Sequence, residues 1–291
     1  MEHVIELENV TKSYDRFRVS DVSLKIKKGF VTGIIGSNGA GKSTMIKMIL
    51  NLMQPDSGMV RIFGEEYTQH EKSIKDRIGF VFSKDVLYDE LTLLAQKKLI
   101  APCYTRWEDA LFYQYCDMFK LPLKQKLKTF SKGMKIKATL AIALSHHAEL
   151  FIMDEPTAGL DPVFRREILD ILQDIMLDGE KSIVLSTHIM SDLSSIADYI
   201  TYVRQGNIIF SKEIHDIQDN YVVVRGGLDL LDSDIEKFFL SIKKTASSFE
   251  GLASNRKAVE EIFEAETIIE KASLGEIMYY MEGGHCDVAI N

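Results

Sequence analysis

Short apolar runs recur along the chain and predict strands that are buried on both faces. They occupy residues 30–35, 150–153 and 182–186 and consist mainly of Ile, Val, Leu, Phe and Met. Unbroken apolarity over such a length is typical of strands in a parallel sheet. Residues 3–8 and 19–26 instead alternate apolar with polar positions, which favours strands with one exposed face. The pattern therefore predicts an α/β fold.

Residues 85–148 differ in character from the segments around them and predict an inserted helical subdomain. Their apolar positions follow helical spacing, with few β-branched runs. We expect Trp107, Tyr113 and Phe119 to fill the core of this subdomain. The predicted helices cover residues 87–100, 107–119 and 135–146.

The pattern changes again from about residue 212 and predicts a small α/β appendage that extends to residue 291. A strand is expected at residues 221–224, a helix at 232–243 and a further apolar-spaced segment at 273–281. Because this part carries no catalytic constellation, regulation, dimer contact and simple packing are all open as its role. The predicted domains are a core of residues 1–84 and 149–211, a helical subdomain of residues 85–148 and an accessory domain of residues 212–291.

Composition excludes several classes of protein. A hydrophobic share of 46% and a charged share of 27% are ordinary for a globular chain of 291 residues. The formal net charge of −8 argues against a nucleic-acid partner, which would need a basic face. Three scattered cysteines form no disulfide framework, which favours a reducing cytosol. We expect neither a signal peptide nor a membrane span, so any membrane role would come through a partner.

A glycine-rich loop is the first candidate for chemistry. It reads Gly36-Ser37-Asn38-Gly39-Ala40-Gly41-Lys42-Ser43-Thr44 and fits the phosphate-loop pattern G-x-x-x-x-G-K-[ST]. A predicted strand precedes it and a helix-like segment follows, which is the setting that this pattern requires. Glycines allow backbone N–H groups to line an anion-binding concavity, and the helix that follows adds its positive end. Lys42 would then reach the β- and γ-phosphates of a nucleotide, and the Ser43 hydroxyl would bind Mg²⁺.

Polar residues follow the other two buried strands. Asp154 and Glu155 come directly after residues 150–153, and His188 follows residues 182–186. In an open α/β sheet, ligands bind at the carboxyl ends of the strands. Asp154 is suited to Mg²⁺, directly or through water, and Glu155 could accept a proton from an attacking water. His188 could hydrogen-bond a γ-phosphate oxygen or that water.

An aromatic residue upstream of the loop has two interpretations. The ring of Tyr14 could stack on a nucleotide base, a contact worth about 1–3 kcal/mol where aromatic rings hold bases. It could equally pack on the edge of the sheet. The residue pattern by itself does not separate the two.

Together, these motifs closely resemble the ATP-binding subunit of an ABC transporter over about residues 2–215. The resemblance implies an ABC-type P-loop ATPase core, RecA-like with an antiparallel β subdomain, together with the inserted helical subdomain and the C-terminal α/β appendage. Residues 36–44 resemble the Walker A motif of this family, 150–155 its Walker B motif with the catalytic glutamate, 158–161 its D-loop, 186–188 its switch histidine and 130–134 its signature.

The resemblance also implies how the site works. Two ATPase subunits, identical or different, pair head to tail, and each ATP lies between Gly36–Thr44 of one subunit and the signature of the other. The cofactor-binding residues would then include Tyr14, which stacks on adenine, and Asp161 of the D-loop. ATP hydrolysis opens the pair and moves a separate integral membrane transporter subunit. The implied location is the cytoplasmic face of the cell membrane. The signature residues expected to contact ATP are Ser131, Lys132, Gly133 and Met134.

Two positions depart from the family pattern. Ser83 stands where the family usually has a glutamine that contacts Mg²⁺ and couples to the membrane subunit. Serine is shorter, so we expect it to reach the metal through an additional water. Lys132 stands in place of a glycine in the usual signature L-S-G-G-Q. Its ammonium could add to the attraction for phosphate or face solvent.

The signature, the separate ATPase chain and the closing stretch Ala272–Met278 resemble those of ATPases from bacterial drug and antimicrobial-peptide exporters. The hypothesis is therefore an ATP-hydrolysing subunit that powers export of a drug, a peptide or a similar amphipathic substrate. One alternative is a soluble ABC ATPase that acts on ribosomes or DNA. Another is a regulatory ATP-binding subunit with weak hydrolysis, which the serine at position 83 keeps open.

Overall fold

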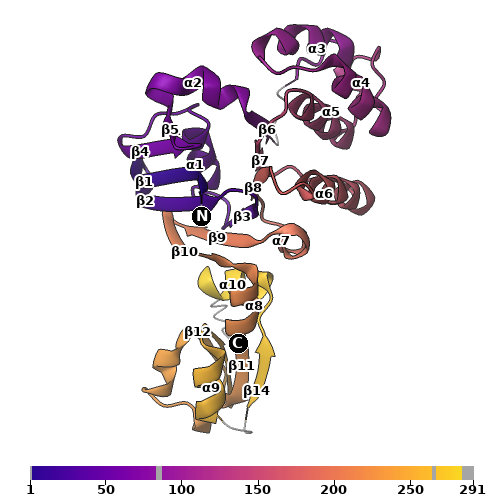
Figure 1. The fold of residues 1–291 in the computed structure, drawn as a ribbon. Coiled ribbons are helices and arrows are strands. Elements are labelled where there is room, and N and C mark those ends of the chain that lie inside the picture. The colour runs from indigo at the N-terminus through magenta and orange to yellow at the C-terminus, as the bar shows by residue number, and fades with distance from the viewer. Residues whose placement is uncertain (1, 83–86, 264–266, 284–291) are drawn as a thin grey trace. The chain divides into compact units, whose positions relative to one another are not determined.

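The structure is a computed structural model that describes residues 2–82, 87–263 and 267–283 (Figure 1). Its internal contacts divide the chain into two compact units, Met1–Ser211 and Lys212–Asn291. We describe each unit by itself. In the described part of the chain, no helix combines the length and the apolarity that crossing a bilayer requires.

A six-stranded sheet in the first unit carries the buried strands, in the order β10-β9-β3-β8-β7-β6. β3, β7 and β8 are buried at every position, as their unbroken apolarity predicts. The pairings of β3 with β8, β7 with β8 and β6 with β7 are all parallel, so their carboxyl ends meet at one edge. The strands are β3 (Val31–Ile35), β6 (Ile78–Phe82), β7 (Leu150–Asp154), β8 (Ser182–Ser186), β9 (Tyr199–Arg204) and β10 (Asn207–Glu213).

A second sheet in the first unit, ordered β2-β1-β4-β5, is antiparallel. Its inward side chains share one apolar core with α1 and with the parallel sheet, in which Leu7, Ile34 and Ile46 are almost completely buried. This shared core holds the helix after β3 in place. The elements are β1 (His3–Ser13), β2 (Arg18–Lys27), β4 (Ser57–Ile62), β5 (Glu65–Glu66), α1 (Lys42–Ile49) and α2 (Tyr67–Asp76).

Between β6 and β7 the chain forms three helices that lie together (Figure 1). Phe112 and Cys116, one turn apart on α4, are buried, and Phe119 is buried with them. The prediction of Tyr113 as a core residue is wrong, because it follows Phe112 by one position, about 100° around the helix, and its side chain is 44% exposed. The helices are α3 (Leu93–Ile100), α4 (Asp109–Met118) and α5 (Lys132–Ser145), with short 3₁₀ turns at Ala101–Cys103 and Leu127–Thr129.

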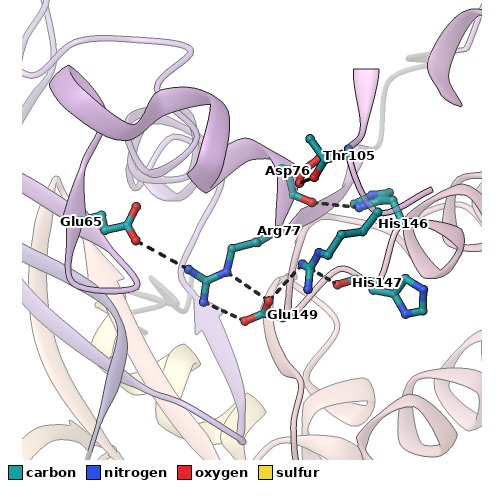
Figure 2. A network of polar contacts seen from close by, with 8 residues as sticks. Glu65, Asp76, Arg77, Thr105, His146, His147 and Glu149 are labelled. Atoms are coloured by element: carbon teal, nitrogen blue, oxygen red, sulfur yellow. Dashed lines mark hydrogen bonds and ion pairs between the residues drawn. The ribbon is translucent and has the colours of Figure 1, made fainter. Parts of the chain in front are cut away.

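A polar network joins this helical segment to the beginnings of β6 and β7 (Figure 2). The guanidinium of Arg77 donates to both oxygens of Glu149, at 3.1 and 2.8 Å, and Arg106 of the helical segment donates to the same carboxylate at 3.0 Å. Asp76 accepts hydrogen bonds from the backbone N–H and the hydroxyl of Thr105. Burial raises the pKa of the Glu149 carboxyl, but the two guanidinium groups outweigh it and hold that pKa below its usual value.

Two helices follow β7 and β8 and complete the first unit. α6 (Pro162–Met176) begins directly after Asp161, because the Asp161 side chain caps it and Pro162 suits the first helical position. α7 (Met190–Ile196) follows the strand that leads to His188.

The second unit is built on a four-stranded sheet ordered β12-β13-β11-β14. The predicted helix at residues 232–243 is wrong, because Phe239–Lys244 forms β12, antiparallel to β13. The ring of Phe239 packs against Phe249 and Phe263, and this long-range packing overrides the local helical spacing. The elements are α8 (Ile214–Asn220), β11 (Val222–Gly227), β12 (Phe239–Lys244), β13 (Ser248–Ala253), α9 (Arg256–Phe263), β14 (Ile268–Lys271) and α10 (Leu274–Met281), with 3₁₀ turns at Leu228–Leu230 and Ile235–Phe238.

Candidate active site

The phosphate-loop segment connects β3 to α1. Gly41 is the N-cap of α1 with φ +113°, a left-handed conformation that favours glycine. No side chain caps α1, so no side-chain oxygen competes with an anion for the N–H groups of its first turn. The ammonium of Lys42 is buried, and it donates to the carbonyl oxygens of Gly36 at 2.7 Å and Ser37 at 3.2 Å. The loop therefore curls around a positive charge next to an open helix N-terminus, which is an anion-binding arrangement.

The carboxyl ends of β7 and β8 deliver the expected acid and histidine to the same place. Nδ1 of His188 lies 2.7 Å from Oε2 of Glu155, while Oε1 of Glu155 lies 3.9 Å from Nζ of Lys42. Glu155 is a non-glycine residue at φ +54°, and its backbone N–H donates to the carbonyl of Ser186. A residue held in the left-handed region beside such groups is typical of a functional position. The structure thus brings Lys42, Glu155 and His188 into one chain of contacts.

Two candidate magnesium ligands lie beside this chain. Asp154 is buried at the end of β7 and accepts a hydrogen bond from the Ser186 hydroxyl, whereas Ser43 is exposed in the first turn of α1. Within the described residues, no group of three or more His, Cys, Asp or Glu could hold a metal. One hydroxyl and one carboxylate fit Mg²⁺, which usually keeps several waters and binds together with substrate phosphates. The third predicted ligand, Ser83, lies outside the described residues.

Tyr14 lies at the edge of the first unit with its ring 45% exposed, and its hydroxyl lies 2.8 Å from the sulfur of Met53. Phe17, which no sequence motif indicates, has its ring centre 6.3 Å from that of Tyr14. A Cβ added at Gly41 would lie 3.0 Å from the Phe17 ring, so this ring contacts the phosphate-loop segment itself. An aromatic residue three positions after Tyr14 was the available signal.

The D-loop and signature residues contact one another. The Asp161 carboxylate caps α6 by accepting from the N–H groups of Val163 and Phe164. Ser131 caps α5 by accepting from the N–H of Met134 at 3.2 Å, and Lys132 donates to the carbonyl of Ala158. These contacts lead from the signature to the D-loop rather than to the phosphate loop in the described part of the chain. The exposed residues Asn38 and Gly39 and the buried Ala40 complete that loop, with Thr44 half-buried in α1.

A buried acid that no sequence motif indicates lies four residues after His188. Asp192 is 1% exposed and accepts a hydrogen bond of 2.6 Å from the Thr157 hydroxyl. This bond ties the segment after Glu155 to α7, four residues after His188. An aspartate on a short helix gives little signal in the sequence, because a buried aspartate and an exposed one cannot be told apart from the residues around them.

The parallel sheet and the lysine-bearing loop define a phosphate-loop nucleotide-binding protein. Over residues 19–158 the sequence matches the family described as ABC transporter. The bacitracin transport ATP-binding protein BcrA of Enterococcus faecalis is 33% identical over 221 residues, which cover 75% of this chain and 71% of that protein. The chain belongs to the ATP-binding ATPase subunits of ABC transporters.

Other relatives agree with this assignment. The lantibiotic transport ATP-binding protein SrtF of Streptococcus pyogenes is 32% identical, with coverage of 72% of this chain and 91% of that protein. A solved ATP-binding subunit of an ABC transporter superposes with a TM-score of 0.67 at 30% identity, covering 74% of this chain and 92% of that chain. A dimeric ATP-binding cassette in a post-hydrolysis state with ADP and Pi gives 0.65 at 26% identity, covering 72% and 98%. The predicted fold class and the resemblance to antimicrobial-peptide exporter ATPases are confirmed.

Proposed function

We propose that the chain hydrolyses ATP at the site formed by residues 36–44, Asp154, Glu155 and His188. The observation that supports this most is the contact chain from Lys42 through Glu155 to His188, next to an α1 N-terminus without a side-chain cap. Lys42 and the loop N–H groups bind the β- and γ-phosphates. Glu155 accepts the proton of the attacking water, and His188 holds one of its carboxylate oxygens.

The exposed Ser43 hydroxyl and the Asp154 carboxylate are suited to hold Mg²⁺ together with the nucleotide. The ion, when bound, neutralises charge that develops on the phosphate oxygens. Ser186 donates to Asp154 and so keeps one carboxylate oxygen oriented. The ring of Tyr14, exposed beside Phe17, stacks on the adenine.

The relatives and one surface of the first unit support the proposed partners. Two copies of this subunit, or this chain and a second ATPase chain, clamp ATP between the phosphate loop of one and Ser131–Met134 of the other. A separate membrane subunit carries the substrate, and the ATPase lies on the cytoplasmic face. Relatives named for bacitracin and lantibiotic transport support export of an antimicrobial peptide or similar amphipathic compound.

An apolar groove in the first unit supports the proposal that this chain contacts a membrane subunit. It has a volume of about 600 Å³, and its lining includes Leu52, which is 60% exposed, and Phe80, which is 37% exposed. Large apolar side chains in an open groove favour a protein contact. Because β6 ends at Phe82, directly before the Ser83 position that the family uses for coupling, we propose that a cytoplasmic segment of the membrane subunit docks here.

The test compares ATP hydrolysis by the wild type with that by Glu155→Gln and Lys42→Ala. We expect Glu155→Gln to lower kcat by about 10²-fold or more, because it removes the general base, and to keep ATP binding. It should also accumulate an ATP-bound dimer, visible by size-exclusion chromatography with light scattering. Lys42→Ala should lose both binding and hydrolysis.

Glu180→Gln serves as a matched control, because that exposed glutamate follows α6 and lies outside the proposed site. Its kcat should equal that of the wild type. Near-wild-type hydrolysis by both Glu155→Gln and Lys42→Ala would reject the proposed site.

A further inference from the structure

The signature carries a lysine whose ammonium lies on the D-loop of the same chain. Lys132 is the first residue of α5, and its Nζ donates a hydrogen bond to the carbonyl oxygen of Ala158. A Cβ added at Gly159 would lie 3.8 Å from this Nζ. The Lys132 side chain is half-buried, so the bond is partly shielded from water and a charged donor strengthens it. Neither expectation for this lysine, phosphate attraction or a solvated charge, describes this contact.

The Ala158 carbonyl belongs to a turn that begins at the proposed general base. The backbone N–H of Ala158 donates to the carbonyl of Glu155 at 3.3 Å, and Glu155 has φ +54°. A left-handed non-glycine residue persists only when its surroundings hold it. Lys132 therefore supplies, from a different element, a charged donor to the turn that orients Glu155.

The N-terminal part of α5 is packed against the residues that follow this turn. A Cβ on Gly133 would lie 2.9 Å from the ring of Phe164, so glycine allows the helix to approach α6 closely. Lys137 is buried, lies 5.4 Å from the centre of the same ring and pairs with Glu167. These contacts fix the position from which the Lys132 side chain reaches Ala158.

We infer that Lys132 is a positioning residue that holds the turn at residues 155–158 and, through it, the Glu155 carboxylate of its own chain. This inference rests on the proposed function. A lysine that instead attracted phosphate would act on the ATP bound to the partner subunit, since the signature faces the partner's phosphate loop in the proposed dimer. An experiment can therefore distinguish a Lys132 that acts on Glu155 of its own chain from a Lys132 that acts on the ATP of the partner subunit.

The first test measures kcat and KM for MgATP in Lys132→Met, which removes the donor and nearly preserves the length of the side chain. We expect kcat to fall by about 10-fold, because the general base loses its orientation, while KM stays within about 2-fold of the wild type. Lys132→Arg keeps a charged donor and should recover most of the lost kcat. Lys128→Met is the matched control, because this nearby lysine pairs with Glu90 at 3.0 Å, and it should leave kcat unchanged.

The second test mixes Lys132→Met chains with Glu155→Gln chains. In the mixed dimer, one site combines Glu155 of the first chain with the wild-type signature of the second. If Lys132 acts within its own chain, that site remains impaired, and mixing does not restore hydrolysis. Restoration toward half of the wild-type activity would show action across the dimer and would overturn the inference.

Two further outcomes of the first test would also overturn the inference: a wild-type kcat in Lys132→Met, or a KM that rises while kcat holds. Neither outcome would affect the proposed function as long as the wild type hydrolyses ATP and Glu155→Gln does not. A wild-type chain without ATPase activity would instead reject the proposed function itself.

Discussion

His146 at the end of α5 is a buried histidine that stays uncharged at neutral pH. Its ring stacks on Tyr104, with centroids 3.7 Å apart and an interplanar angle of 9°. Its Nδ1 lies 3.2 Å from the backbone carbonyl of Asp76 (Figure 2). The pKa of the imidazole is lowered to about 4, and burial is the main cause. The hydrogen bond to the Asp76 carbonyl and the charge of Asp76 raise this pKa but do not outweigh burial, and the charge of Arg106 lowers it further.

The lowered pKa predicts acid sensitivity. The unfolded chain binds a proton at His146 near the ordinary pKa of 6.5, whereas the folded chain binds it only near 4, so the free energy of unfolding falls as pH drops through this window. Between about pH 7.5 and about pH 5 the wild type should lose about 2 kcal/mol more than His146→Asn, which keeps a donor to Asp76. Denaturant unfolding followed by fluorescence of Trp107, the single tryptophan, measures this. Equal losses in both proteins would contradict the prediction.

At the scale of elements, α6 follows the turn at residues 155–158, which begins at the proposed general base. The Asp161 carboxylate accepts from two N–H groups in the first turn of this helix, which would otherwise lack partners. The resemblance to the ABC family implies a role for Asp161 at the nucleotide interface, so capping and nucleotide binding are two possible contributions of one side chain.

Substitution separates these contributions. Asp161→Ala should lower the free energy of unfolding by about 1 kcal/mol, because the cap is lost, whereas Asp161→Asn keeps a capping oxygen and should leave stability near that of the wild type. Thermal unfolding of the two variants measures the difference. If Asp161→Asn is stable but loses ATP hydrolysis, the charge acts at the nucleotide interface as well; equal stability of Asp161→Ala and the wild type would contradict the capping role.

At the scale of the whole molecule, transport requires that the ATPase site be mechanically connected to a membrane partner. The groove lined by Leu52 and Phe80 lies along β6, which pairs in register with β7, so that Phe82 stands opposite Asp154. One edge of the sheet thus carries the proposed magnesium ligand, and a surface beside the same strands carries the proposed docking groove. Because packed strands are rigid, a displacement at the docking groove can be transmitted to the magnesium ligand.

Loss of the groove's apolar surface should uncouple the ATPase from its partner. The double variant Leu52→Ser, Phe80→Ser should still bind ATP and, when combined with Glu155→Gln, still form the ATP-bound dimer, because both side chains are exposed. It should no longer copurify with the integral membrane subunit from detergent-solubilised host membranes. Leu177→Ser is the control, since Leu177 is 83% exposed at the end of α6, away from the groove. Copurification of the double variant at the wild-type level would place the partner elsewhere.

Several features of the site were readable from the order of residues because they depend on local chemistry. The glycine spacing of residues 36–44, the carboxylates after residue 153 and the histidine after residue 186 all follow apolar strands, and parallel pairing brings such strand ends together. Phe17 and Asp192 were missed, because their roles come from contacts with Gly41 and Thr157, which are distant from them in the sequence.

Errors in the predicted elements have the same cause. Helical spacing at residues 232–243 is a weak local preference, and it gave way to the pairing of β12 with β13 and to the packing of Phe239. Tyr113 and Phe112 are equally plausible core residues from composition. Only the direction in which α4 packs decides that Phe112 is buried and Tyr113 is not.

The sequence by itself determined the chemical class of the site, because a phosphate loop needs particular residue types at a particular spacing and cannot be built otherwise. It also determined which strands are buried, since apolar surface must leave water. Only the tertiary structure decided which groups the charged side chains contact. The ammonium of Lys132 binds the Ala158 carbonyl, and the carboxylate of Asp161 caps the first turn of α6. Such contacts depend on the distance between elements far apart in the chain, which packing sets and local sequence does not.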